Sequence, residues 1–171
     1  MTAANKFSPV PEPVPYSVRR ATHADATGIL QCLRAAFETF RESYTPEAFA
    51  DTVLTPEMLQ RRLTTMALFV AVSPAGEIVG TIGYSLGSTV EGHLRGMAVH
   101  PHHQGCGVAG GLLQACEAEL RERKCLRISL GSTKPLQRAI RFYERNGYRA
   151  SGKITDFFGM PLFEYVKHLR T

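Results

Sequence analysis

A glycine-rich segment between an expected strand and an expected helix holds the residues best suited to chemistry. It covers residues 100–111 and has the sequence HPHHQGCGVAGG. The first amides of a helix are unpaired donors at the positive end of the helix dipole, and small residues let an anion approach the backbone. The segment therefore predicts a phosphate-binding turn, with a tightly packed structural connection as the alternative.

Two common phosphate-binding motifs do not account for this segment. A Walker A loop requires Gly-Lys-Ser/Thr at the helix start, whereas Gly110 is followed by glycine and leucine. Gly105, Gly107 and Gly110 match the pattern G-x-G-x-x-G of dinucleotide-binding domains. Such domains also need an acidic residue at the end of the next strand, and that strand ends with Leu-Gly-Ser at residues 130–132. The sequence disfavours both kinds of nucleotide site.

Two blocks of the sequence resemble a known family. Residues 104–109, Gln-Gly-Cys-Gly-Val-Ala, resemble the Gln/Arg-x-x-Gly-x-Gly/Ala signature of the GNAT N-acetyltransferase superfamily. Residues 139–148, Ala-Ile-Arg-Phe-Tyr-Glu-Arg-Asn-Gly-Tyr, are similar to its A-x-x-[FL]-Y-x-x-x-G-[FY] segment. The blocks occur in the family's order, and the resemblance extends over residues 16–167. One departure is Leu136, where many members carry asparagine.

The resemblance implies both a fold and an activity. The fold would be α/β (α+β), with a mixed, mostly antiparallel central sheet that is splayed at the cofactor site and flanked by helices. The activity would be direct transfer of an acetyl group, in a ternary complex, from acetyl-CoA to a primary amine of a small-molecule or amino-acid-like acceptor, with no metal. A protein N-terminal or lysine acetyltransferase and a non-catalytic CoA-binding sensor module are the alternatives.

The resemblance also implies where acetyl-CoA binds. The pantetheine arm would lie along the main chain of Met97 and Val99, and the amides from Gly105 to Gly110 would hold the pyrophosphate. Backbone donors suit this task because they are in place before the ligand arrives. Cys106 occupies a variable position of the signature, so we do not expect covalent catalysis by its thiol. The implied cofactor-binding residues are Met97, Ala98, Val99, Gln104, Gly105, Cys106, Gly107, Val108, Ala109 and Gly110.

Tyr143 is the implied catalytic residue. From spacing alone, an aromatic residue beside Phe142 on the buried face of a helix favours core packing. In the family, the corresponding tyrosine lies near the sulfur of the cofactor and donates a proton to the departing thiolate. A phenol with a pKa of about 10 is protonated at neutral pH and can donate that proton.

The sequence leaves the general base open. His93, Glu91 and His100 flank the strand before the turn. Glu42 and Asp51 lie in the region that shapes the acceptor pocket in relatives. A chain of water molecules is a further alternative.

Positive charge is concentrated in one segment of the sequence. The chain has 20 Lys and Arg against 15 Asp and Glu, and residues 121–149 hold nine basic and two acidic residues. A solvated surface explains this cluster, and contact with the 3′-phosphate of coenzyme A through Lys134, Arg138 or Arg145 is the functional alternative. The segment has no nucleic-acid reader motif, so no nucleic-acid partner is expected.

The spacing of apolar residues predicts the elements that position these groups. A strand–helix–strand unit is expected around the glycine-rich turn, with antiparallel strands at the edges of the sheet. The expected strands cover residues 16–20, 68–72, 78–86, 93–99, 126–130 and 162–167, with one more from residue 148. The expected helices cover residues 24–42 and 56–63, with others beginning at residues 107 and 135.

Length and composition predict one domain over residues 16–171, after a proline-rich flexible tail at residues 1–15. A chain of 171 residues with 44% hydrophobic residues can form its own core. No apolar run approaches the roughly 20 residues of a membrane span, and four cysteines without a C-x-x-C pair favour reduced thiols in the cytoplasm. A homodimer through Phe157, Phe158 and Phe163 is an alternative to burying these rings in the core.

Overall fold

The computed structural model describes residues 15–170, so the predicted tail lies outside the described residues except for its last position. In chain order the elements are β1 (Ser17–Arg20), a 3-10 turn (His23–Asp25), α1 (Ala26–Phe37), a 3-10 segment (Glu38–Ser43), α2 (Pro46–Val53), α3 (Pro56–Thr65), β2 (Ala67–Val72), β3 (Ile78–Ser88), β4 (Glu91–Val99), a 3-10 turn (Pro101–His103), α4 (Val108–Glu122), β5 (Arg127–Thr133), α5 (Gln137–Arg145), β6 (Arg149–Phe157) and β7 (Met160–His168).

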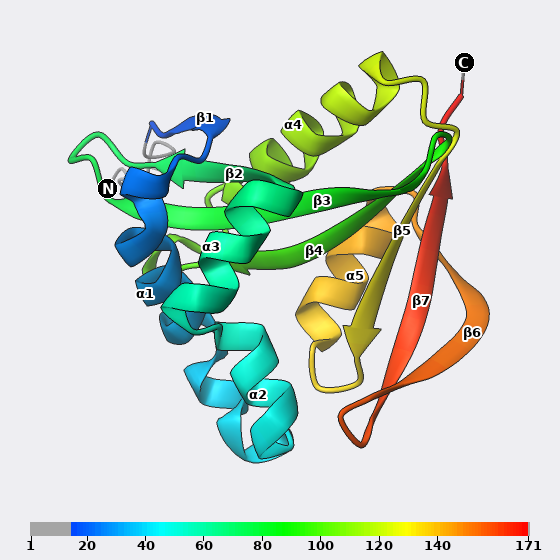
Figure 1. The fold of residues 1–171 in the computed structure, drawn as a ribbon, viewed down its shortest axis with the longest axis horizontal. Helices are drawn as coiled ribbons and strands as arrows, with labels where there is room; N and C mark the ends of the chain where they lie inside the picture. Colours follow the sequence, from blue (N-terminus) through cyan, green and yellow to red (C-terminus); the bar gives the residue numbers. More distant parts are fainter. Residues whose placement is uncertain (1–14, 171) are drawn as a thin grey trace, which may run out of the picture.

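The strands form one seven-stranded sheet in the order β1-β2-β3-β4-β5-β7-β6. Neighbouring strands are antiparallel, except that β4 and β5 are parallel and are connected through α4. Figure 1 shows this arrangement, which confirms the predicted mixed, mostly antiparallel sheet with flanking helices.

The two parallel strands in the centre of the sheet separate along their length. β4 and β5 pair only from Glu91↔Arg127 to Leu94↔Leu130, and both strands then continue without pairing to each other. The β3–β4 register shifts next to this point, and Gly96 has a φ of +71° there. Such a bulge bends a strand away from its neighbour. In Figure 1, α5 is seen between the diverging strands.

Helices cover both faces of the sheet. α4 and α5 pack on one face, where glycines let α4 approach closely, because a Cβ atom on Gly92 would lie 2.6 Å from Leu120 Cδ2. On the other face α1, α2 and α3 form a second apolar cluster, which also includes Met160 near the tip of the β6–β7 hairpin. The gap between β4 and β5 is therefore bounded by different helices on its two faces.

The first half of the chain differs from the prediction in two places. The helix expected over residues 24–42 ends at Phe37 and continues as a 3-10 segment, where the Phe37 ring packs 6.2 Å from Phe40 and 6.5 Å from Tyr44 between centroids. α2 was not predicted. Its start carries ordinary signals, because the Thr45 hydroxyl accepts a hydrogen bond from the Ala48 amide at 3.2 Å and a proline follows the cap.

Over residues 15–170, no helix is long and apolar enough to cross a membrane. In the same part of the chain, no three His, Cys, Asp or Glu side chains gather as a set of metal ligands.

A buried carboxylate connects α4 to the strands beyond β5. Glu117, only 6% exposed, accepts hydrogen bonds from the Tyr148 hydroxyl and the Lys167 ammonium, each at 3.0 Å, and Arg121 pairs with it at 3.2 Å. These bonds connect the crossover helix to the end of α5 and to β7.

We predict that Glu117→Ala lowers the free energy of unfolding by about 2–4 kcal/mol, because it leaves a buried phenol and a half-buried ammonium without a partner. Urea unfolding followed by circular dichroism measures this change. The control is Glu122→Ala on the exposed surface of the same helix, which should stay within about 0.5 kcal/mol of the wild type. Equal losses in the two variants would contradict the prediction.

Candidate active site

The glycine-rich turn presents its backbone to solvent at the start of α4. Gly105 and Gly107 have φ values of +77° and +82°, in the left-handed region, and Gly107 is the N-cap of the helix. A Cβ atom on Gly110 would meet nothing within 4 Å. Side chains at these positions would strain the backbone or fill the open space, so the turn keeps its helix-start amides accessible to an anion.

Side chains that are distant from one another in the sequence hold this turn in place. The Tyr16 hydroxyl donates to the Gly107 carbonyl. The Gln104 amide donates to the Val99 carbonyl at 3.3 Å and its oxygen accepts from Arg138 at 3.0 Å. Arg138 therefore lies beside the turn and adds positive charge to the helix dipole.

The predicted cofactor residues form a continuous path from β4 into α4. The His100 amide donates to the Val79 carbonyl at 2.8 Å. Antiparallel pairing alternates, so the main-chain groups of Val99 turn away from β3, toward the gap, where its carbonyl accepts from Gln104. Met97 lies two residues earlier, at the register shift between β3 and β4. Ala98 instead buries its side chain in the cluster beside α1, at 4% exposure.

The remaining predicted residues line the turn itself. Val108 is buried against the sheet at 2% exposure, and Cys106 and Ala109 are half-buried.

Tyr143 lies on the buried face of α5, on the α4 side of the gap. Its ring packs 5.5 Å from Tyr148 and 5.3 Å from Phe142 between centroids. Burial and the nearby Cys116 thiol raise the pKa of Tyr143, so the phenol is neutral at physiological pH. Within residues 15–170, its hydroxyl forms no hydrogen bond. The residue both packs in the core and keeps a proton that it can donate.

Ser132 was missed by the sequence reasoning. It lies on β5 beyond the last residue that pairs with β4, is 3% exposed, and within the described residues its hydroxyl has no hydrogen-bond partner. Strand alternation puts it on the same face as Leu130, which belongs to the cluster that contains Tyr143. A buried hydroxyl without a partner is costly, and a ligand in the gap would satisfy it. No motif in the sequence marks this serine.

The opposite face of the gap carries a chain of hydrogen bonds that ends on His93. Its Nδ1 atom lies 2.9 Å from the Ser129 hydroxyl, and that hydroxyl donates to Glu91 at 3.1 Å. A serine hydroxyl has one proton, so His93 must donate from Nδ1, and its Nε2 atom carries a lone pair. Burial and the charge of Arg95 lower the pKa of His93. The neutral imidazole is therefore the form present at pH 7.

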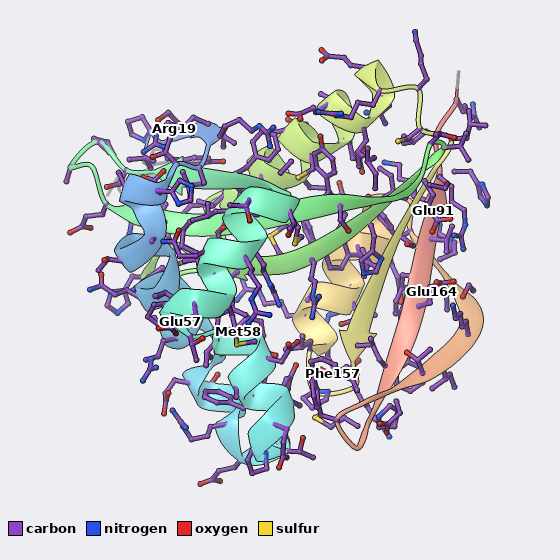
Figure 2. The ribbon with its side chains drawn as sticks, in the orientation of Figure 1. Arg19, Glu57, Met58, Glu91, Phe157 and Glu164 are labelled. Atoms are coloured by element: carbon purple, nitrogen blue, oxygen red, sulfur yellow. The ribbon has the colours of Figure 1, made fainter. Side chains whose placement is uncertain are left out.

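Ion pairs surround His93 along this face. Arg127 contacts Glu91 at 2.6 Å and Glu164 at 3.2 Å. Figure 2 labels both carboxylates, which project from β4 and β7.

The other candidates for the base have different environments. Asp51 pairs with Arg95 at 2.8 Å. His100 lies at the far end of β4, where its ring packs against His102, and Glu42 is exposed. Among the five residues considered from the sequence, the hydrogen-bonded chain singles out His93 with Glu91 behind it.

The basic residues considered for the 3′-phosphate separate into two groups. Arg138 contacts the turn through Gln104. Arg145 lies at the end of α5, about 10 Å further along the helix axis, in a surface hollow with Arg141, Glu144 and Arg149. Lys134 is exposed before the helix.

A sheet that opens beside a glycine-rich turn, with a buried neutral tyrosine on one face and a neutral histidine on the other, is an arrangement suited to acyl transfer from a CoA thioester. The chain belongs to the acetyltransferase (GNAT) family, whose model matches residues 29–148. It is an N-acetyltransferase, and acetyl-CoA is its cosubstrate.

Solved structures share the fold. The PaiA N-acetyltransferase of Thermoplasma acidophilum, in complex with coenzyme A, superposes with a TM-score of 0.76 at 16% identity, over 91% of this chain and 99% of that chain. A GNAT acetyltransferase of Staphylococcus aureus gives 0.74 at 19% identity, over 91% and 100%. The ribosomal-protein-S18-alanine N-acetyltransferase of Escherichia coli gives 0.74 at 14%, over 92% and 96%.

We predict that Gly107→Ala weakens binding of coenzyme A about tenfold or more, because the strained turn shifts its amides. Titration calorimetry with coenzyme A measures the affinity. Gly76→Ala is a matched control, since Gly76 has a φ of +84° in the open turn between β2 and β3. Both variants should lose about 1–2 kcal/mol of stability, but only Gly107→Ala should lose affinity. Unchanged affinity in Gly107→Ala would exclude the turn from the site.

Proposed function

We propose that this protein transfers the acetyl group of acetyl-CoA to the primary amine of a small molecule, directly, in a ternary complex. The observation that carries the proposal is the His93–Ser129–Glu91 chain at the point where β4 and β5 diverge. It offers an unprotonated nitrogen on the face opposite Tyr143. Acid and base would then approach the gap from its two sides, as transfer between two bound substrates requires.

The turn and the strand before it would hold the cosubstrate. The amides from Gly105 to Gly110 would bind the pyrophosphate, and the main chain of Met97 and Val99 would bind the pantetheine arm. Arg138 is within reach of the phosphates, because a Cβ atom on Gly105 would lie 3.8 Å from its guanidinium. Gln104, Cys106, Val108 and Ala109 complete the proposed lining, with Ala98 contributing its main chain.

The two faces of the gap would handle the two protons of the reaction. As the amine nitrogen bonds to the acetyl carbon, the carbon–sulfur bond of the thioester breaks, the nitrogen loses one proton and the sulfur gains one. The Nε2 atom of His93 takes the proton from the amine, while Ser129 and Glu91 stabilise the imidazolium from behind. Tyr143, whose pKa is raised by burial, gives its proton to the sulfur.

Release of the CoA thiol across a panel of small amines tests this function. Turnover of one or more small amines is expected, and short peptides with a free N-terminus or a lysine provide the comparison arm. Acetylation of peptides alone would replace the proposal with protein acetylation. Stabilisation by acetyl-CoA without thiol release on either arm would favour the sensor module. The cytoplasmic location and the homodimer stay predictions.

We predict that Tyr143→Phe lowers kcat about 100-fold, because it removes the acid but keeps the packing of the ring. The affinity for coenzyme A should not change, so stopped-flow turnover and calorimetry together measure the effect. Tyr165→Phe is the control, since Tyr165 packs at the edge of the same cluster on β7. Full turnover in Tyr143→Phe would remove the proposed role.

We predict that His93→Gln lowers kcat/KM about 100-fold, because glutamine can donate to Ser129 but cannot take up a proton. In the wild type, His93 is the active base only above its pKa, which is lowered from the ordinary 6.5. Activity should therefore fall as the pH drops below that lowered pKa, and this acid limb should be absent in His93→Gln. His23→Gln, on the exposed surface, should keep it. An unchanged acid limb in His93→Gln would assign the base elsewhere.

A further inference from the structure

Two guanidinium groups share one carboxylate beside the bulge of β4. Arg95 pairs with Asp51 at 2.8 Å, and Arg62 approaches the same oxygen at 3.9 Å while donating to the Asp51 carbonyl at 3.2 Å. The side chains of Arg62 and Asp51 are only 13% and 16% exposed. One positive charge in this cluster is therefore uncompensated, and Arg95, which is 46% exposed, presents the cluster to solvent.

This excess charge lies where the two central strands begin to separate. Arg95 directly follows Leu94, the last residue of β4 that pairs with β5. The Arg62 guanidinium lies 3.4 Å from the place of a Cβ atom on Gly96, and both arginines line a small pocket with that glycine. Burial and the charge of Arg95 lower the pKa of Arg62 to about 10. Arg62 therefore stays positive at pH 7, and a bound anion would relieve its repulsion with Arg95.

The opposite charge is in excess on the other side of His93. Glu91 and Glu164 share Arg127, which leaves one negative charge near the imidazole. The positive charge of Arg95 lowers the pKa of His93, and that of Lys153 on β6 lowers it more weakly. The proposed base, His93, therefore lies between an excess of negative charge on one side and an excess of positive charge on the other.

The proposed base and the excess positive charge are neighbours on one face of β4. His93 and Arg95 are two residues apart on that face, since Gly92 and Leu94 face α4. The Cα atoms of such neighbours are about 6.6 Å apart along a strand. One small molecule can therefore contact both side chains, with its amine at His93 and an anionic group at Arg95.

We propose that the acceptor carries an anionic group next to its amine, as in an amino acid, and that Arg95 with Arg62 binds the anion while His93 receives the amine. This substrate class rests on the proposed acetylation of a small amine. The proposed site would distinguish a free amino acid from a peptide N-terminus, because the peptide has no carboxylate next to its amine.

The experiment compares glycine and each L-amino acid that has a primary amine with the corresponding primary amide. Binding to the CoA-loaded protein is measured by calorimetry, and turnover by release of the CoA thiol. The amide keeps the size and loses the charge, and its less basic amine is easier to deprotonate, so amine basicity cannot produce a preference for the acid. We expect at least one acid to bind and react about tenfold or more better than its amide.

Variants assign that preference to the arginine pair. Arg95→Gln should reduce the ratio between acid and amide about tenfold, and Asp51→Asn, which removes the competing carboxylate, should raise it. Arg20→Gln is the matched control, because the Arg20 side chain is 50% exposed against 46% for Arg95 and also forms an ion pair. It should leave the ratio unchanged.

The possible results distinguish failure of the anion site from failure of the proposed acetylation. Amides that bind and react as well as the acids, or an Arg95→Gln ratio equal to that of the wild type, would overturn the anion site while leaving the acetylation of small amines intact. Acids that bind in an Arg95-dependent manner without turnover would support the anion site and overturn the proposed function. Failure of every acid to bind would overturn the anion site.

Discussion

The separation of β4 from β5 is the constraint on which the rest of this structure depends. Parallel strands in the middle of a sheet normally satisfy each other's main-chain groups along their length. Here the pairing stops at Leu94 and Leu130, next to the left-handed Gly96. Beyond that point β4 and β5 no longer pair with each other, and within the described residues the Ser132 hydroxyl has no hydrogen-bond partner. The sheet stays intact because α4 bridges the two strands and β7 pairs with the whole of β5.

Burial shifts the pKa values on the two sides of this gap in opposite directions, and both shifts favour the neutral side chain. Removing a group from water disfavours its charged form. It therefore raises the pKa of Tyr143 and lowers the pKa of His93. Both side chains are consequently neutral at pH 7, which is the form that the proposed acid and the proposed base need before the proton moves. Because strand and helix layers separate the two groups, neither neutralises the other.

Local signals were enough to predict the glycine-rich turn and the helices around it. Gly105 and Gly107 adopt backbone conformations that other residues rarely reach, and their spacing before an apolar helix is visible within a few residues. α2 shows the limit of such local signals. Its Thr-Pro start was present, but its eight residues are too few for a clear helical repeat of apolar residues. The helix expected to reach residue 42 ended at Phe37 because aromatic contacts with Tyr44 favour a tighter turn there.

The sequence by itself determined the family of this protein, through two blocks that resemble the family's motifs. It also determined the glycine-rich turn and the tyrosine on the following helix, since these depend on short-range backbone preferences and on spacing. Only the tertiary structure decided which groups face the acceptor. His93 meets Ser129 because β4 and β5 pair in parallel register, and Arg62 meets Arg95 because α3 packs over the bulge. Charges that are distant in the chain become neighbours through strand register and helix packing, which local spacing does not encode.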